Sequence, residues 1–286
     1  MIETPRKIVT QPEITPPTAN KILVHPWNQR RKTVVITFFL LAVISLYELM
    51  TLSTGNVQLP TAFKTLGQNM ALIFLQPSLN GSDTFPQLLR ALLDSVALTT
   101  LTTLLGAICS FFVGLLAASN LSNPKIGTAI RTLMAIIRAI PTILWVLIFS
   151  IVIGLGADAA VIGLSFHSFA YLTKAYSESF ETLDKGTIES LKAMGASWWQ
   201  IVFQAILPTS FAALLSWTFI RFEINFTNAI AVGAAAGAGG IGYQLFTASG
   251  FYYDFHEVGV IVYLCLAVTA CLEFISIKLQ KRYLSN

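Results

Sequence analysis

Long apolar stretches separated by short polar segments run through the chain, a pattern typical of proteins whose helices cross a lipid bilayer. About six stretches are long enough, or nearly so, to span the hydrocarbon core, which takes about 20 helical residues at 1.5 Å each. They cover residues 33–50, 91–118, 132–157, 159–173, 200–220 and 258–277. The fourth reaches full length only with flanking residues. The pattern predicts an all-α polytopic membrane protein with about six transmembrane helices.

The composition agrees with this fold class and excludes several kinds of protein. The chain has 286 residues, of which 55% are hydrophobic and 11% charged, and its mean hydropathy is +0.69. Soluble domains carry roughly 25% charged residues, so a cytosolic enzyme, a disordered protein and a secreted disulfide-rich module are excluded. The net charge of +4 marks the cytoplasmic ends of membrane helices and does not indicate a nucleic-acid partner.

No group of side chains has the arrangement of a catalytic or metal site. Cys109, Cys265 and Cys271 all lie in apolar stretches, where thiols pack as small apolar groups. Neither a nucleophile with a neighbouring base nor a set of metal ligands is recognisable in the sequence. His167 has no second ligand at a suitable spacing, so we expect a packed or hydrogen-bonded histidine. We therefore expect no enzymatic activity and no cofactor bound by this chain.

Lysine and arginine residues indicate the orientation in the membrane. They cluster before residue 33, between 118 and 132, between 173 and 200, and after 277. The positive-inside rule places these segments, and with them both termini, in the cytoplasm. Residues 1–32 are rich in Pro and Thr and are expected to form a flexible cytoplasmic tail. We expect a first transmembrane helix at 33–50, an extracytoplasmic or interfacial segment at 51–87, and the main body at 88–286.

A cytoplasmic loop, residues 174–199, is predicted to hold a short helix of about two turns. Thr187 is a suitable N-cap, Glu189 follows in the first turn, and Gly195 suits the left-handed position after the helix. Ser197 and Gln200 then form a capping box that opens the next spanning helix. Such a helix either docks into a groove on a soluble partner or rests on lipid headgroups, and the pattern alone leaves both open.

This loop resembles the EAA loop of ATP-binding-cassette (ABC) importer permeases, whose pattern is E-A-A-x3-G-x9-I-x-L-P. The Glu, Gly and Leu-Pro positions match at the right spacing, while a Ser-Leu pair replaces the two alanines and Ala205 takes the isoleucine position. The replacements keep these positions small or apolar. The resemblance implies that the motif couples the chain to an ATPase through Glu189, Ser190, Leu191, Gly195, Leu207 and Pro208.

A second motif is similar to the phosphonate-type permeases. Arg221-Phe222-Glu223-Ile224-Asn225 is followed by a Gly-rich stretch that ends at Gly242, and the resemblance covers roughly residues 90–282. It implies a type I importer permease core in the bacterial inner membrane, paired as a homodimer. It also implies two partners, an ATPase that holds ATP and Mg²⁺ and an extracytoplasmic solute-binding protein. The implied solute is phosphonate-like or another phosphorus oxyanion.

Other functions remain open at this point. The same kind of importer could carry another small solute, such as methionine or phosphate, or the chain could be a stand-alone secondary transporter or channel. The sequence has no G-x-x-x-x-G-K-[ST] phosphate-binding loop. If transport is ATP-driven, the nucleotide must therefore be held by another polypeptide.

Charged residues also lie within the predicted membrane spans. Arg221 and Glu223 follow Pro208 by about 20 Å of continuous helix, well inside the bilayer, where a charge costs roughly 2.5–3.5 kcal/mol. With Asn225 and Arg138 they are candidates to line a translocation path for an oxyanion, Glu223 being bonded to a neighbouring helix. A structural polar network is the alternative for Arg221 and Glu223, and Arg138 is equally suited to the cytoplasmic interface.

The Ala- and Gly-rich run 229–242 has no bulky side chains to anchor a spanning helix. Irregular backbone at membrane depth requires protein or a water-filled cavity around it. We expect a re-entrant or gate segment that uses the glycines of this run, namely Gly237, Gly239, Gly240 and Gly242. Close helix packing through small residues is the alternative. Earlier in the chain, Pro141 is expected to kink the third spanning helix.

Overall fold

The computed structural model describes residues 29–51, 58–79 and 83–284, with side chains up to residue 278. Every regular element in these ranges is a helix, in agreement with the predicted all-α class. The chain divides into two compact units, residues 1–59 and 60–286. The predicted tail at 1–32 lies outside the described residues up to position 28.

In the first unit the described structure is α1, Gln29–Thr51, which contains the helix predicted for 33–50 and begins four residues earlier. None of its side chains is buried. The hydroxyls of Thr33 and Thr37 donate to carbonyl oxygens one turn back, at 3.1 and 2.8 Å, which satisfies these polar groups within the helix. A helix that is apolar all round requires a lipid environment.

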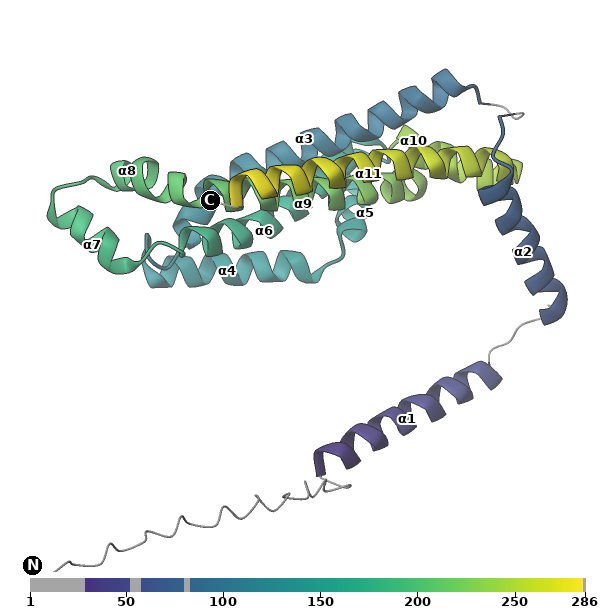
Figure 1. The fold of residues 1–286 in the computed structure, drawn as a ribbon, viewed down its shortest axis with the longest axis horizontal. Coiled ribbons are helices and arrows are strands. Elements are labelled where there is room, and N and C mark those ends of the chain that lie inside the picture. Colours follow the sequence, from purple (N-terminus) through teal and green to yellow (C-terminus); the bar gives the residue numbers. More distant parts are fainter. Residues whose placement is uncertain (1–28, 52–57, 80–82, 285–286) are drawn as a thin grey trace, which may run out of the picture. The chain divides into compact units, whose positions relative to one another are not determined.

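The second unit is a bundle in which α3, α6, α9 and α11 run side by side (Figure 1). The bounds of its elements are α2 Leu59–Leu75, α3 Phe85–Ala117, α4 Pro124–Ala139, α5 Thr142–Ile153, α6 Ala157–Phe180, α7 Lys185–Ala193, α8 Trp198–Ile201, α9 Leu207–Ala236, α10 Gly240–Thr247 and α11 Phe255–Leu284. Two single turns of π-helix, Val202–Ile206 and Ala248–Tyr252, complete it.

Among the described residues, four helices are long and apolar enough to cross a membrane. They are Gln29–Thr51, Phe85–Ala117, Trp198–Ala236 and Phe255–Lys278, and a fifth is counted if α4 and α5 form one broken span. The remaining predicted span, 159–173, lies in α6, whose 24 residues are about 36 Å long. Because α3, α4, α5 and α9 all pack on it, α6 does not need an apolar surface on every side. The polytopic all-α fold is thus confirmed.

Pro141 separates two helices instead of kinking one. Helices α4 and α5 meet at 87°, and Ile140 between them has the extended backbone that a following proline favours. A proline has no N–H, so the carbonyl of Ile137 would lose its helical donor here. The indole Nε1 of Trp145 donates to that oxygen instead, at 2.9 Å. The corner is therefore a satisfied and specific feature of the fold.

A second proline, Pro208, explains the π-turn that opens α9. It stands at the second position of the helix and supplies no N–H for the carbonyl four residues earlier. The preceding residues widen into a π-turn, and Leu207 N–H bonds the carbonyl of Val202. The helix then continues without a break to Ala236. Arg221 and Glu223 consequently lie deep in a continuous helix, as the sequence predicted.

Candidate functional site

The predicted short helix is present as α7, with a different beginning. Asp184, not Thr187, is its N-cap: the Asp184 carboxylate accepts from the backbone N–H of Thr187 at 3.3 Å. A carboxylate three residues before an unpaired helical N–H is as good a cap as a hydroxyl, and it sets the start at Lys185. Glu189 therefore lies in the second turn, and the nine residues span about 13 Å.

The end of α7 matches the prediction. Gly195 has φ +86°, its N–H donates to the carbonyl of Lys192 at 2.9 Å, and the next N–H, of Ala196, donates to Leu191 at 3.1 Å. This pair of bonds is a Schellman motif, which requires a residue that tolerates positive φ. The capping box is also confirmed, since Ser197 and Gln200 bond one another's backbone N–H groups.

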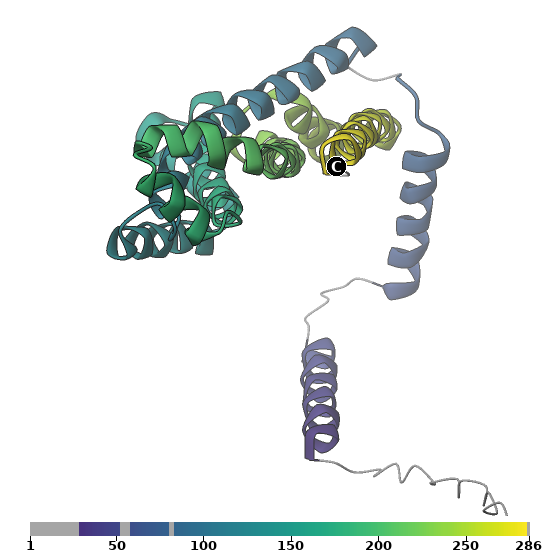
Figure 2. The same ribbon diagram turned by 60° about the vertical axis from the view of Figure 1, so that its left-hand side comes forward.

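Helix α7 lays one face on its own chain and leaves the other free. Ile188 is 1% exposed, and it packs with Leu191 in an apolar cluster formed by the ends of α3, α6 and α9. Glu189 and Ser190 are exposed, and Met194 just after the helix is 75% exposed. Figure 2, in which this end of the unit comes forward, shows the two short green helices in front of the bundle. The apolar face is thus already covered by protein, and a polar face is free.

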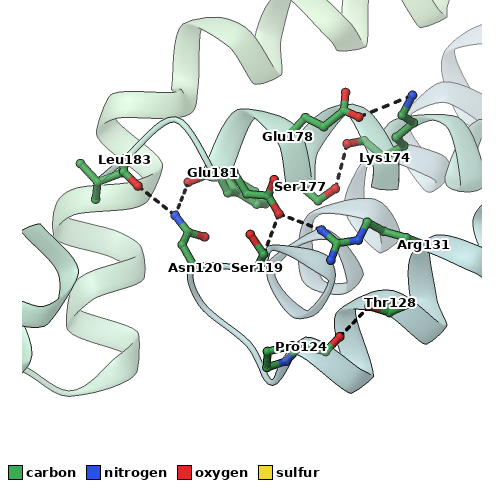
Figure 3. A network of polar contacts seen from close by, with 11 residues as sticks. Ser119, Asn120, Pro124, Thr128, Arg131, Lys174, Ser177, Glu178, Glu181 and Leu183 are labelled. Carbon is green, nitrogen blue, oxygen red and sulfur yellow. Dashed lines mark hydrogen bonds and ion pairs between the residues drawn. The ribbon is translucent and has the colours of Figure 1, made fainter. Parts of the chain in front are cut away.

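A polar clamp, which sequence analysis missed, ties the segment before α7 to the loop between α3 and α4 (Figure 3). The Glu181 carboxylate accepts from the backbone N–H of Ser119 at 2.6 Å and from Arg131 at 2.9 Å. The amide of Asn120 donates to the carbonyls of Phe180 and Leu183, at 2.9 and 3.1 Å. These partners are 50 to 63 residues apart in sequence, so no local pattern announces them.

The candidates Arg221 and Asn225 come together at the centre of the bundle. Arg221 is 1% exposed; its Nε donates to Ser168 Oγ at 3.0 Å, and an Nη2 hydrogen points to His167 Nδ1 at 3.0 Å. The amide nitrogen of Asn225 donates to Ser168 Oγ at 2.8 Å and to Thr103 Oγ1 at 2.9 Å. We call Arg221, Asn225, Ser168, His167 and Thr103 the Arg221 cluster.

Two features of the Arg221 cluster decide its electrostatics. A guanidinium has only donors, so His167 Nδ1 must accept and carries no proton. His167 is thus a hydrogen-bonded histidine, as expected from the sequence. Within the described residues Arg221 has no carboxylate partner, and the other stabilising neighbour is the ring of Tyr171, 5.2 Å from the guanidinium carbon. The cluster therefore carries a positive charge that no acidic side chain in this part of the chain neutralises.

Glu223 and Arg138 lie apart from this cluster. Glu223 is half-buried, at i+2 from Arg221 and hence on another side of α9. The expected bond from Glu223 to a neighbouring helix is not found: among the described residues the Glu223 carboxylate has no hydrogen-bond or ion-pair partner, and only its backbone carbonyl accepts a side-chain bond, from Thr227 at 3.4 Å. Arg138, in the last turn of α4, is half-buried.

The Gly-rich run combines a break with close packing. Against expectation, residues 229–236 remain helical, because the small size of Ala and Gly lets α9 pack closely against α10. The chain then breaks at Gly237 and Gly239, with φ of 62° and 76°. A Cβ added to Gly242 would overlap the carbonyl oxygen of Ile230, so this contact requires glycine. The alternative of close packing through small residues therefore describes the α9–α10 contact, and irregular backbone follows it.

A cavity of about 320 Å³ adjoins the break. Asp94 and Ser95 of α3, Ala157 at the start of α6, and Gly239 and Gly240 line it, with Ala97, Leu98 and Ala238. The hydroxyl of Ser95 accepts from the backbone N–H of Ile241 at 3.0 Å and anchors the start of α10. Irregular backbone that lines a cavity is the arrangement that a bilayer tolerates.

These features define a multi-pass membrane protein of the transporter class, with a charged polar centre inside an apolar bundle and a capped helix at one end. Residues 110–284 match the model of the family "Binding-protein-dependent transport system inner membrane component". The chain belongs to this family, which consists of transport components and not of enzymes. The family resemblance seen in the sequence is thereby confirmed, as is a location in the inner membrane.

Related proteins narrow the resemblance to the phosphonate type. The chain is 31% identical over 190 residues to the phosphate-import permease PhnE of Mycolicibacterium smegmatis, a match that covers 66% of this chain but 35% of that one. It is 29% identical over 196 residues to the phosphite transport system permease PtxC of Stutzerimonas stutzeri, a match that covers 68% of this chain and 70% of that one. The methionine import permease MetP of Bacillus subtilis is 29% identical over 126 residues, or 42% of this chain and 56% of that one.

Solved structures show that the fold is shared more widely. A chain of the inward-facing MetNI methionine ABC transporter superposes with a TM-score of 0.62 at 22% identity, over 70% of this chain and 99% of that one. A chain of an amino acid ABC transporter superposes with a TM-score of 0.58 at 17% identity, over 80% of this chain and 100% of that one. At these identities the likeness concerns the fold alone.

Proposed function

We propose that the chain is the permease subunit of an ABC importer that translocates a phosphonate-like or other phosphorus oxyanion. In this proposal it works as a homodimer, receives its solute from an extracytoplasmic solute-binding protein, and is driven by separate ATPase subunits that hold ATP and Mg²⁺. Both termini face the cytoplasm. The observation that carries the proposal is the free polar face of α7 on a helix that the chain caps and clamps rigidly.

The proposed coupling acts through the shape of α7. An ATPase that closes on ATP must push on something stiff, and the N-cap, the Schellman motif and the capping box fix both ends of this segment. Glu189 and Ser190 face the partner, whereas Leu191 holds the helix to the bundle. Gly195 turns the chain, and Leu207 and Pro208 form the stiff entry to α9, so movement of α7 reaches the helix that carries Arg221.

The proposed translocation path includes Arg138, Arg221, Glu223 and Asn225. A buried guanidinium without a carboxylate partner attracts anions, and its hydrogen bonds to neutral groups keep it in place without neutralising it. If Arg221 served only to hold helices together, a neutral side chain could make the same hydrogen bonds without the free-energy cost of a charge inside the membrane. We assign the break at Gly237, Gly239 and Gly240, with Gly242 packed behind it, to a gate on this path.

A second solute class has a specific observation in its favour. Methionine permeases appear among the related sequences and among the proteins of like fold. A zwitterionic amino acid also carries a carboxylate that Arg221 would attract. The two candidates differ in the rest of the solute, so a direct comparison of solutes separates them.

Reconstitution of the complete importer tests the proposal. The chain is co-expressed with ATPase and solute-binding subunits from the same organism, reconstituted in proteoliposomes, and assayed with labelled methylphosphonate, phosphite, phosphate and methionine. We expect ATP-dependent uptake of at least one of the three oxyanions and no uptake by the chain alone. Uptake of methionine alone identifies the second candidate, and transport by the chain without ATPase contradicts both.

A further inference from the structure

A second cavity, lined by three cationic side chains, lies between α4 and α6, toward the end of the bundle that carries α7. Its volume is about 190 Å³, and it is lined by Arg131, Met134, Ala135, Arg138, Thr173, Lys174 and Glu178. Sites for drug-sized ligands have about 300–1,000 Å³. This cavity is therefore of a size for a small ion and not for a large organic molecule.

The positive residues of this cavity lie on two facing helices, two on α4 and one on α6. Arg131 and Arg138 are seven residues apart, two turns of α4, and therefore lie on one face. On α6, the neutral His167 of the Arg221 cluster and the cation Lys174 of the cavity have the same spacing. His167 in turn accepts from Arg221 at 3.0 Å. The cavity thus lies about two helical turns along α6 from the Arg221 cluster.

Its charges are incompletely paired. Arg131 bonds Glu181 at 2.9 Å, and Lys174 reaches Glu178 at 3.5 Å, with both side chains of the latter pair about half exposed. Arg138 has no carboxylate within ion-pair distance in the described part of the chain. Three cations against two carboxylates leave one positive charge, and exposed pairs of this kind bind weakly and exchange partners readily.

We propose that this cavity is the cytoplasmic-side binding site for a tetrahedral phosphoryl or phosphonyl oxyanion, held between Arg138 and Arg131. The inference rests on the proposed function and deepens it: the site is where the solute pauses on leaving the Arg221 cluster. Arginine suits this role because its planar donors bind such oxygens in pairs. Thr173 also lines the wall, and its hydroxyl donates to Ser110 Oγ at 3.3 Å.

The site has a consequence for the clamp that holds α7. Arg131 is shared, because the anion and the Glu181 carboxylate compete for the same guanidinium. Occupation of the cavity therefore weakens one of the two bonds that Glu181 makes, while the bond from Ser119 remains. The solute would thus be sensed at the joint between α4 and the segment that leads to α7.

The test uses the purified importer with its ATPase in vesicles of phosphatidylcholine only, with the cytoplasmic face outward. Binding of inorganic phosphate, phosphite and methylphosphonate is measured by calorimetry on the wild type, Arg138→Gln, Arg138→Lys and Lys174→Gln. Lys125→Gln, on the exposed first turn of α4 and outside the cavity, is the matched control. We expect Arg138→Gln to weaken binding by about tenfold or more, the loss of one charge-assisted bond, and Arg138→Lys to weaken it less.

Equal affinity in the wild type, Arg138→Gln and Lys174→Gln overturns the site. Because Lys174 is half exposed, its variant keeps the test open even where Arg138→Gln does not fold. A second arm titrates the importer with phosphatidylglycerol. If calorimetry detects binding of this lipid and no binding of the free oxyanions, the cavity holds lipid headgroups and the solute site is overturned. Absence of oxyanion uptake by the wild type contradicts the proposed function, whereas uptake together with unchanged binding in the variants contradicts this site alone.

Discussion

The carboxylate of Glu181 and the guanidinium of Arg131 lie 2.9 Å apart and join the end of α6 to the middle of α4. The same carboxylate accepts from the backbone N–H of Ser119, so one side chain connects three segments of the bundle (Figure 3). Since α7 follows within a few residues, this joint fixes the position from which α7 projects. Its rigidity decides how far a movement of α7 is transmitted.

Glu181→Gln is expected to uncouple ATP hydrolysis from uptake. The amide still accepts from Ser119 but no longer neutralises Arg131, so the joint becomes looser without losing every contact. The two side chains are 37% and 29% exposed, and solvent screening limits the loss of stability to about 1 kcal/mol or less. The number of ATP molecules hydrolysed per solute imported should rise several-fold. An unchanged ratio, with the exposed carboxylate variant Asp158→Asn as control, would contradict this role.

Glu189→Ala and Gly195→Pro should both leave membrane insertion intact and reduce ATP-driven uptake, by different routes. Glu189 contributes to the exposed face of α7, whereas proline at 195 cannot adopt φ +86° and lacks the N–H that bonds Lys192. The amount of ATPase that co-purifies with each variant is the measurement. Glu48→Ala, which removes an exposed carboxylate of α1, serves as the control. Full uptake and normal ATPase retention in both variants would remove α7 from the coupling mechanism.

Arg221→Ala should lower the maximal rate of uptake by about tenfold or more, because it removes the buried positive charge that attracts the oxyanion, and a charge-assisted interaction contributes roughly 1.5–3 kcal/mol. The solute concentration at half-maximal uptake should change little, since the binding protein sets it. Arg221→Lys keeps the charge but not the paired donors, and we expect an intermediate rate. Kinetics like those of the wild type in Arg221→Ala, in correctly folded protein, would leave the Arg221 cluster as a structural network.

Gly242→Ala should destabilise the bundle by about 1–3 kcal/mol, the usual cost of overpacking, since the new methyl group meets the backbone of Ile230. Gly250→Ala is the matched control, because the nearest atoms to its Cβ are 3.8 and 4.0 Å away. The fraction of protein that stays monodisperse after heating in detergent measures the difference. If the monodisperse fraction falls at the same temperature in the two variants, the contact between Gly242 and Ile230 is not tight enough to exclude a methyl group.

Local signals in the sequence predicted much of the site. The end of α7 at Gly195 and the capping box at Ser197 depend on neighbouring residues, and both were correct. The N-cap was misplaced because Asp184 and Thr187 are both good caps, and in the structure the carboxylate of Asp184 takes this role. Pro141 was recognised as a disruption, but the 87° corner depends on Trp145, whose indole reaches back to Ile137.

Contacts between distant segments could not be predicted. Asn225 was a candidate on its own, yet its partners Ser168 and Thr103 lie 57 and 122 residues away. His167 appeared isolated because its partner, Arg221, is on another helix. The clamp at Glu181 shows no motif at all. Such pairs are set by how helices pack, and a single sequence carries no record of that.

Photo-cross-linking at α7 tests the central claim most directly. A photoreactive amino acid replaces Glu189 or Lys192 on the exposed face of α7, and in a control it replaces Phe63, which is exposed on α2. The complete importer is irradiated in membranes with and without ATP. We predict that the photoreactive groups at positions 189 and 192 form a covalent product with the ATPase subunit and that ATP changes the yield of this product. We predict no such product from position 63. Cross-links from 189 and 192 to lipid alone, with the ATPase present and active, would contradict the proposal that α7 is driven by it.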